Sequence, residues 1–358
     1  MIINYLAYND TTDPSFLADE KTAVDILEAT IADNITVNIK IGYGDFNGIT
    51  LPDQTKSGGD VNQSIFQFVD YATLQSDLEK YGQPGFFNST NLPSDPGQSN
   101  FWISSAEAKI FGISTPLGAI DGYVGIGTSF TPGAERVAAL LHEITHALGR
   151  VPENQTALGS TYYSALDLWR FTSTDTRLWD GTTNPTTAAP VQAAWFSVTG
   201  GTNPIRNWGM TSDPSDFLYP TSSNDTVDNK NDPFNESVSS TDDTLTSADL
   251  QIMDALGFTT RALPNLEIDS LTPTGDTVTV GESISVGAAV HNYGPGAAGS
   301  FSTRIYISAD STFNSNATLL ATFTTASLAS DAIVDLNQSV NVPNLARPIR
   351  ESAAFGPD

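Results

Sequence analysis

Apolar positions near the start of the chain predict a helix followed by a strand. In DPSFLADEKTAVDILEATIADN, residues 13–34, apolar side chains recur at mostly helical intervals behind a proline that suits a helix start. ITVNIKIGYG then alternates apolar and polar residues from Ile35 to Ile41, which indicates a strand. Two further helices are predicted at YATLQSDLEKYG and SSAEAKIFG, each closed by a glycine. Helices and strands are therefore mixed in this part of the chain.

The pattern changes twice in the second half of the chain. Residues 171–247 are rich in turn-forming residues and have little periodicity, which predicts long surface loops. TSADLQIMDALGF restores helical spacing, with Thr246 or Ser247 as N-cap and Gly257 as the stop. The later stretches TVTVGESISVGAAVHNYG and GSFSTRIYISAD have the period of two that is typical of a β-sandwich. We therefore predict two domains, residues 1–262 and 263–358.

Charge and composition narrow the class of partner. The chain has 358 residues, 41 acidic and 15 basic, so its formal net charge is −26. That charge repels phosphate backbones and anionic lipid and argues against nucleic-acid or membrane-surface binding. No apolar run reaches the roughly 18 residues that span a bilayer, so no membrane insertion is expected. Loops of Ser, Thr, Asn and Gly are common in bacterial extracellular proteins, so we expect secretion, although the first residues show no signal peptide.

The stretch ALLHEITHALGR carries two of the three histidines. At about 100° per residue, His142 and His146 lie about 40° apart on one helical face, one turn apart, which suits two imidazoles on one zinc ion. Glu143 can then act as the general base on a metal-activated water. Because the chain has no cysteine, any metal must rest on His, Asp, Glu or Asn. An ordinary amphipathic helix with two exposed histidines is the competing interpretation.

The extended motif HEITHALGRVP resembles the HExxHxxGxxH pattern of metzincin proteases, with Gly149 where that family's chain leaves the helix. Pro152 stands at the family's third histidine, so the short form of the site is incomplete. Residues 1–260 resemble bacterial secreted metalloproteases related to the leishmanolysin-like group, on the segments YYSALDLWRFTS, NWGMTSDPSDFLYP and LTSADLQIMDALGF. The resemblance implies an α+β metzincin-like catalytic domain, with a mixed twisted sheet and a zinc helix, that hydrolyses peptide bonds.

The third metal ligand stays open. The resemblance places Asn207 at the position of a later histidine ligand, but an amide oxygen is a weaker zinc ligand than imidazole. Asp167, Asp213 and Asp216 are the carboxylate candidates. Asp167 lies 21 residues after His146 on a predicted helix, which suits a third ligand, while a pair with Arg170 at i, i+3 is the competing role. A damaged site with weak or no zinc binding is a further alternative.

The resemblance also implies a substrate-binding strand. DGYVGIGTSF, with Gly122, Tyr123, Val124 and Gly125, would be the edge strand that pairs with an extended peptide substrate. Unpaired backbone groups at a sheet edge permit that kind of binding.

An acidic stretch in the second half is a candidate calcium loop. SSNDTVDNKNDPFNESVSSTDD offers oxygen ligands of the kind that Ca²⁺ prefers, although the spacing does not match an EF-hand. A solvated acidic loop is the alternative. The carboxylates concerned are those of Asp225, Asp228, Asp232, Glu236, Asp242 and Asp243.

Residues 263–358 resemble a bacterial CARDB (cell-adhesion-related) domain, an all-β immunoglobulin-like sandwich. VHNYGPGAA and RIYISAD carry the resemblance, and it makes His291 a strand or turn residue and not a ligand. LARPIRESAAFGPD does not continue the alternation, so we expect a sandwich truncated at its last strands, with an exposed edge. Such a domain implies contact with a cell surface or matrix.

Three functions follow from these patterns. The first is a secreted zinc-dependent endopeptidase whose partner is a protein or peptide substrate. The second is a non-catalytic adhesion or binding protein that retains a degenerate protease fold, for which Pro152 and Asn207 are the best support. The third is a metal-dependent hydrolase of another bond, because HExxH fixes the attacking water and not the bond that is cut.

Overall fold

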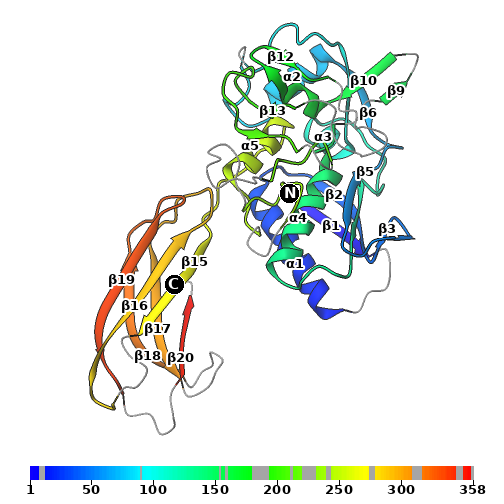
Figure 1. The fold of residues 1–358 in the computed structure, drawn as a ribbon. Coiled ribbons are helices and arrows are strands. Elements are labelled where there is room, and N and C mark those ends of the chain that lie inside the picture. The colour runs from blue at the N-terminus through cyan, green and yellow to red at the C-terminus, as the bar shows by residue number, and fades with distance from the viewer. Residues whose placement is uncertain are drawn as a thin grey trace. The chain divides into compact units, whose positions relative to one another are not determined.

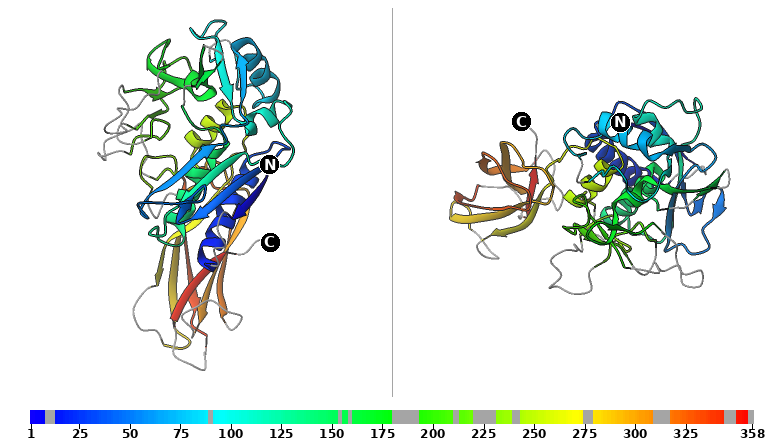
Figure 2. Two further views of the ribbon diagram at one scale, coloured as in Figure 1. Left: turned by 90° about the vertical axis from the view of Figure 1, so that its right-hand side faces the viewer. Right: turned by 90° about the horizontal axis from the view of Figure 1, so that it is seen from above.

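The computed structural model describes two compact units, Met1–Arg261 and Ala262–Asp358, drawn in Figure 1 and Figure 2. The first unit mixes α and β structure and the second is built of strands. Among the described helices, none has the length and apolar content that crossing a bilayer requires. The described residues are 1–7, 13–88, 91–152, 155–157, 160–179, 193–209, 213–219, 231–238, 243–273, 279–308, 317–343 and 350–355.

The first unit is organised around a four-stranded sheet in the order β1-β2-β8-β5. The first three strands run parallel and β5 runs antiparallel to β8. Helix α4 packs against β5 and β8, and helix α1 packs against α4. The elements are β1 (Ile2–Ala7), α1 (Pro14–Thr30), β2 (Thr36–Tyr43), β5 (Ser57–Val61), β8 (Gly122–Ile126) and α4 (Ala134–Leu148).

Shorter elements complete this unit. Two small sheets have the orders β6-β7-β10-β9 and β12-β11-β13-β14, and β3 and β4 form a hairpin. The helices are α2 (Tyr71–Tyr81), α3 (Ser105–Ile110), η1 (Ala165–Trp169) and α5 (Ser247–Ala255). The strands are β3 (Asp45–Phe46), β4 (Ile49–Thr50), β6 (Gln67–Asp70), β7 (Asn100–Ile103), β9 (Gln155–Ala157), β10 (Ser160–Ser164), β11 (Arg170–Ser173), β12 (Thr176–Arg177), β13 (Trp195–Phe196) and β14 (Arg206–Asn207).

The helices predicted from periodicity are confirmed. Helix α1 begins at Pro14, with the Asp13 side chain accepting hydrogen bonds from the first turn. Helix α2 ends at Gly82, and Thr246 caps α5 with a reciprocal Asp249 bond. Between β11 and α5 the described residues contain only strands of two residues, as the weak periodicity of that stretch predicts.

Two glycines let α4 lie directly on the sheet. A Cβ atom at Gly59 of β5 would lie 2.1 Å from the Glu143 carbonyl oxygen, and one at Gly122 would lie 2.7 Å from the Ala147 Cβ. Contacts that short are impossible for real side chains, so glycine is required at both positions. The main chain of β5 therefore touches the main chain of α4 at Glu143.

Glu107 in α3 carries a buried carboxyl under the end of α4. One of its oxygens accepts a 2.6 Å hydrogen bond from the Ser104 backbone N–H, and the Ser104 hydroxyl donates to the Leu148 carbonyl. Burial raises the pKa of Glu107 to about 8, from an ordinary value of 4.5. The folded protein therefore holds this proton at neutral pH, whereas the unfolded chain releases it.

This difference predicts that stability falls as pH rises from about 4.5 to about 8. In that window the unfolded state binds fewer protons, so Glu107 lowers the free energy of unfolding by up to about 1.4 kcal/mol per pH unit. In the Glu107→Gln variant, which keeps an acceptor for Ser104, we expect a shallower decline. Urea denaturation across the window measures it, and an unchanged slope in the variant would contradict the assignment.

The second unit consists of two three-stranded antiparallel sheets, in the orders β15-β16-β19 and β18-β17-β20. Ile284, Val286, Ile305, Ile307 and Val340 are in the apolar core between them. The strands are β15 (Leu266–Pro273), β16 (Ser283–Asn292), β17 (Phe301–Ser308), β18 (Thr318–Thr325), β19 (Ile333–Asn341) and β20 (Arg350–Phe355).

The last described residues of this unit form a strand, and His291 lies in another strand. The expectation that LARPIRESAAFGPD adds no strand is wrong, because Arg350–Phe355 forms β20 and pairs along β17. Backbone pairing needs no apolar alternation, which is why the pattern missed it. His291 lies in strand β16, as predicted, with its ring nitrogens 3.3 Å from Asp269 and 3.2 Å from Asp331.

Candidate metal centre

Helix α4 presents one face to a cavity. Glu135, Ala139, His142 and His146 follow the i, i+4, i+7, i+11 spacing of a single helical face, and all four line the cavity. Gly149 ends the helix with φ +135°, a conformation that side chains rarely adopt. Both histidines thus lie one turn apart on the side of α4 that faces the cavity.

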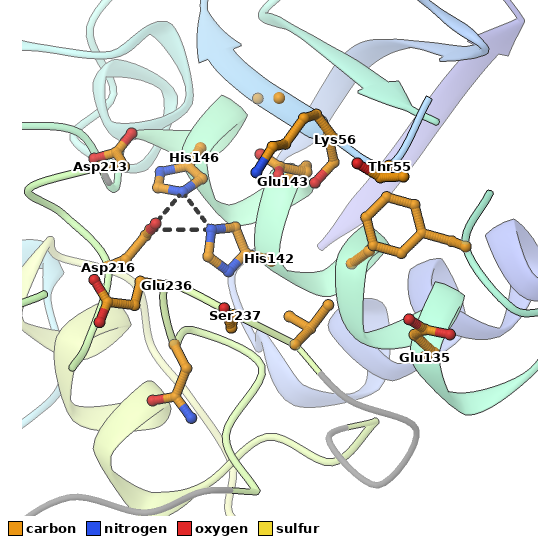
Figure 3. A pocket seen from close by; sticks show the side chains of 17 residues that line it. Thr55, Lys56, Glu135, His142, Glu143, His146, Asp213, Asp216, Glu236 and Ser237 are labelled. Carbon is orange, nitrogen blue, oxygen red and sulfur yellow. Dashed lines mark hydrogen bonds and ion pairs between the residues drawn. The ribbon is translucent and has the colours of Figure 1, made fainter. Parts of the chain in front are cut away.

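Asp216 completes a triangle with the two histidines (Figure 3). The two Nε2 atoms lie 2.9 Å apart, and the Asp216 Oδ1 atom lies 3.0 Å from His142 Nε2 and 3.1 Å from His146 Nε2. Tetrahedral zinc with bonds of about 2.0 Å separates its ligands by about 3.3 Å. The three side chains are therefore near enough to bind one metal ion.

The Nδ1 atom of each imidazole already has a hydrogen-bond partner. His142 Nδ1 lies 2.7 Å from the Pro233 carbonyl oxygen, and His146 Nδ1 lies 2.7 Å from the Arg150 carbonyl oxygen. Carbonyl oxygens only accept, so Nδ1 carries the proton in both rings and each Nε2 keeps its lone pair in the neutral form. Two lone pairs and a carboxylate then converge on one point, which is a donor set for a cation.

Electrostatics keep the Asp216 carboxylate ionised. Burial disfavours its charge, but His142 and His146 outweigh burial through charge and hydrogen bonds and hold the pKa of Asp216 well below its usual range. Burial likewise disfavours a charged His142, and Asp216 and Glu143 outweigh it and raise the pKa of that imidazole. The triangle therefore attracts positive charge.

The positively charged Arg150 side chain lies beside the triangle. Its buried guanidinium lies 2.9 Å from His146 Nε2 and 3.4 Å from Asp216 Oδ1. It also donates to the Ser215 and His142 carbonyls at 2.7 and 3.2 Å and stacks on the Phe234 ring at 4.3 Å. Arg150 thus ties the end of α4 to the segment that carries Asp216.

Glu143 lies next to the triangle and lines the same cavity. The residue is only 6% exposed, yet no hydrogen bond reaches its carboxylate within the described ranges. Its main chain rests on Gly59, which fixes its height above the sheet. The carboxylate is therefore positioned to act on something within the cavity.

Neither predicted third ligand is part of the triangle. Asp167 is fully buried, its Oδ2 accepts 3.1 Å bonds from the backbone and hydroxyl of Ser164, and its other oxygen lies 3.6 Å from Arg170. The competing role at i, i+3 is therefore the one observed. Asn207 lies in β14, paired with Trp195, and does not line the cavity. Of the three carboxylate candidates, Asp216 is the one that lies beside the two histidines.

The predicted substrate strand is also wrong as to its place. Gly122, Tyr123, Val124 and Gly125 lie in β8, which is paired on one side with β2 and on the other with β5. Its backbone groups are used within the sheet. The two edge strands of this sheet are β1 and β5, and Ser57, Gly58 and Gly59 of β5 line the cavity.

The described carboxylates of the acidic stretch have separate places in the structure, and calcium binding by this stretch stays a prediction. Asp232 is fully buried, and its Oδ2 accepts 3.0 Å hydrogen bonds from Arg206 and Thr246. Glu236 instead lines the cavity beside the triangle. Of the other candidates, Asp243 is half-buried, and Asp225, Asp228 and Asp242 lie outside the described residues.

The cavity measures about 390 Å³. Five carboxylate side chains, one lysine and the two histidines line it, together with the edge strand and the segment that follows Phe234. The charged lining residues are Lys56, Glu135, Glu143, Asp213, Asp216 and Glu236. A space of this size admits part of a peptide.

The CARDB family model matches residues 263–347. The C-terminal unit contains a CARDB domain. This family match lies outside residues 1–261, so the metzincin resemblance of the first unit stays a prediction. No curated protein matches the chain.

Solved structures similar to the chain cover only part of it. The CARDB domain of a Pyrococcus furiosus protein, in complex with di-metal ions, is 23% identical, covers 23% of this chain and 60% of its own, and has a TM-score of 0.18. β-Glucosidase 3B from Thermotoga neapolitana is 21% identical over 22% of this chain and 10% of its own, with a TM-score of 0.18. The chain thus spans a small part of the glucosidase and less than two thirds of the archaeal chain.

Proposed function

We propose that the first unit is a zinc-dependent endopeptidase in which His142, His146 and Asp216 hold the metal. One observation carries the proposal. Three ligand atoms lie within 3.1 Å of one another at the wall of a cavity, with both outer imidazole nitrogens bonded to carbonyls and Glu143 beside them. Two histidines and a carboxylate are a ligand set that zinc accepts.

Each side chain has a role in this proposal. When bound by His142, His146 and Asp216, zinc would supply Lewis-acid chemistry, which would polarise a carbonyl group and lower the pKa of water. Glu143 accepts the proton of the attacking water and returns it to the leaving amine. The Pro233 and Arg150 carbonyls orient the two imidazoles, since a hydrogen bond to Nδ1 fixes the ring and its tautomer.

The edge strand β5 is the proposed substrate platform. It borders the cavity along Ser57, Gly58 and Gly59 and has a sheet partner on one side only. An extended peptide can add to such an edge through main-chain hydrogen bonds. We propose that the protein acts outside the cell and that its CARDB domain contacts a cell surface or matrix.

A non-catalytic binding protein is the second candidate, and Arg150 favours it. A guanidinium 2.9 Å from His146 Nε2 could neutralise the triangle in place of a metal. The Arg150→Met variant separates the two. If the chain is an enzyme, the wild-type protein and the Arg150→Met variant both bind about one equivalent of zinc. If Arg150 replaces the metal, the wild-type protein binds no zinc and the variant gains affinity for zinc.

Zinc content by mass spectrometry and casein cleavage with and without chelator test the proposal. One tightly held zinc, with cleavage abolished by chelator and restored by zinc, supports the endopeptidase. Bound zinc with no cleavage of casein or of a peptide library would favour hydrolysis of another bond. A protein with neither zinc nor cleavage would favour the binding protein.

A further inference from the structure

The lining of the cavity is strongly acidic even without the proposed catalytic groups. With Glu143 and Asp216 set aside, Glu135, Asp213 and Glu236 remain, against the single lysine Lys56 in the described lining. Figure 3 shows these carboxylates on both sides of the triangle. Metal binding does not account for them, because His142, His146 and Asp216 are the described residues that converge.

Two of these carboxylates lie beside the triangle. Glu236 has an oxygen 2.7 Å from the position of a Cβ at Gly209, whose backbone N–H donates to the Asp216 carbonyl. Asp213 Oδ1 accepts from the backbone and hydroxyl of Ser215, at 2.8 and 2.6 Å. Both carboxylates are thus held close to the residue that completes the metal site.

Glu135 lies farther along the same helical face. It is seven residues before His142, which is about 10 Å along a helix, and its Oε2 accepts a 3.0 Å bond from the Thr131 N–H. An extended peptide advances about 3.3 Å per residue, so 10 Å corresponds to about three residues. Along the direction of α4, the cavity therefore has an anionic group near the triangle and another that is displaced by about three residues of extended peptide.

The Glu143 carboxylate is a further feature of this cavity. Glu143 is 6% exposed, lines the cavity and has no hydrogen-bond partner within the described ranges, and its oxygens are open to the cavity, so a group that enters can bind them. The formal charge of −26 adds a long-range field that concentrates cations near the protein.

We propose that this cavity selects peptides that carry a lysine or arginine beside the scissile bond, next to Asp213 and Glu236, and a second basic residue about three positions away, next to Glu135. The proposal rests on the proposed endopeptidase function. Carboxylates in a partly desolvated cavity attract a basic side chain, and repel an acidic one, more strongly than the same groups in water. Lys56 opposes the effect at the β5 wall but is outnumbered.

The test uses the full chain with zinc and internally quenched peptides. Each peptide carries one Lys, Gln or Glu, placed in turn at every position from directly beside the cleaved bond to about four residues away on either side. We expect kcat/KM about tenfold higher for Lys than for Gln beside the bond, and lower still for Glu, with the preference weakening as salt rises. Glu236→Gln should reduce the preference beside the bond, and Glu135→Gln the preference at the more distant position.

Glu79→Gln, on the exposed side of α2, is the matched control and should change neither preference. Binding is measured separately on Glu143→Gln by fluorescence anisotropy with labelled Lys and Gln peptides. Tighter binding of the Lys peptide by this variant, together with no cleavage of either peptide by the zinc-loaded wild-type protein, would uphold the selectivity and contradict the endopeptidase. Equal binding and equal kcat/KM for Lys and Gln peptides, with cleavage intact, would overturn the selectivity alone.

Discussion

Glu143→Gln is expected to lower kcat/KM for peptide cleavage by about a thousandfold while the protein keeps its zinc. The amide has nearly the size of the carboxylate but cannot accept the proton of the attacking water, and a positioned general base contributes about 10² to 10⁴ in rate. Because Glu143 is not part of the triangle, its loss leaves the metal ligands in place. Initial rates with a quenched peptide, and zinc content by mass spectrometry, measure the two effects.

The control for this variant is Glu79→Gln, a carboxylate replaced on an exposed helix face. It should leave both the rate and the zinc content at wild-type values. A Glu143→Gln protein with activity within a few-fold of wild type would show that another group moves the proton. A variant that lost its zinc would instead place Glu143 among the ligands.

Asp216→Ala is expected to weaken zinc binding by at least about a hundredfold. The substitution removes the only carboxylate in the triangle and leaves two neutral imidazoles, while zinc in proteins usually has at least three protein ligands. Competition with a chromophoric chelator gives the affinity, and circular dichroism shows whether the fold survives. Cleavage should be lost together with the metal.

Asn207→Ala and Asp167→Asn are the informative controls for the third ligand. Asn207 does not line the cavity and Asp167 is bonded to Ser164, so both variants should retain zinc. Asp167→Asn should lose stability, because it weakens a buried pair with Arg170. If Asn207→Ala released the metal and Asp216→Ala did not, the assignment of Asp216 would be wrong.

The helical half of the site could be predicted from sequence because its information is local. His142, Glu143 and His146 lie within five residues, and the helix period alone sets their relative directions. Gly149 is a helix stop that sequence rules recognise, and it stands at φ +135°. The same local rules gave the start of α1 at Pro14 and the cap of α5 at Thr246.

The sequence could not distinguish among the candidate third ligands, because a long segment without periodicity separates them from the histidines. Asp216 is 70 residues from His146 in sequence, and spacing carries no information over such a distance. Which of Asp167, Asp213 and Asp216 lies beside the histidines depends on tertiary contacts such as those of Arg150. Arg150 directly follows Gly149 and is fully buried. The metal-ligand motif alone does not predict this burial.

The order of strands in the sheet was the other feature that the sequence did not predict. DGYVGIGTSF has the composition of a strand, but its place inside the sheet depends on β5, whose sequence SGGDV has no apolar alternation. Those glycines were the available signal. A strand of consecutive glycines is explained by a close backbone approach, here of Gly59 to Glu143.

The close approach of Gly59 to Glu143 fixes the distance between strand β5 and helix α4. The spacing depends on the thickness of two main chains and on no side chain, so repacking of the surrounding core cannot alter it gradually. Exchanges at the cavity rim, at Glu135 or Glu236 for example, can accumulate without shifting Glu143 relative to β5. Substrate preference can therefore change during evolution while the position of Glu143 stays the same. Gly59 must remain glycine for this to hold.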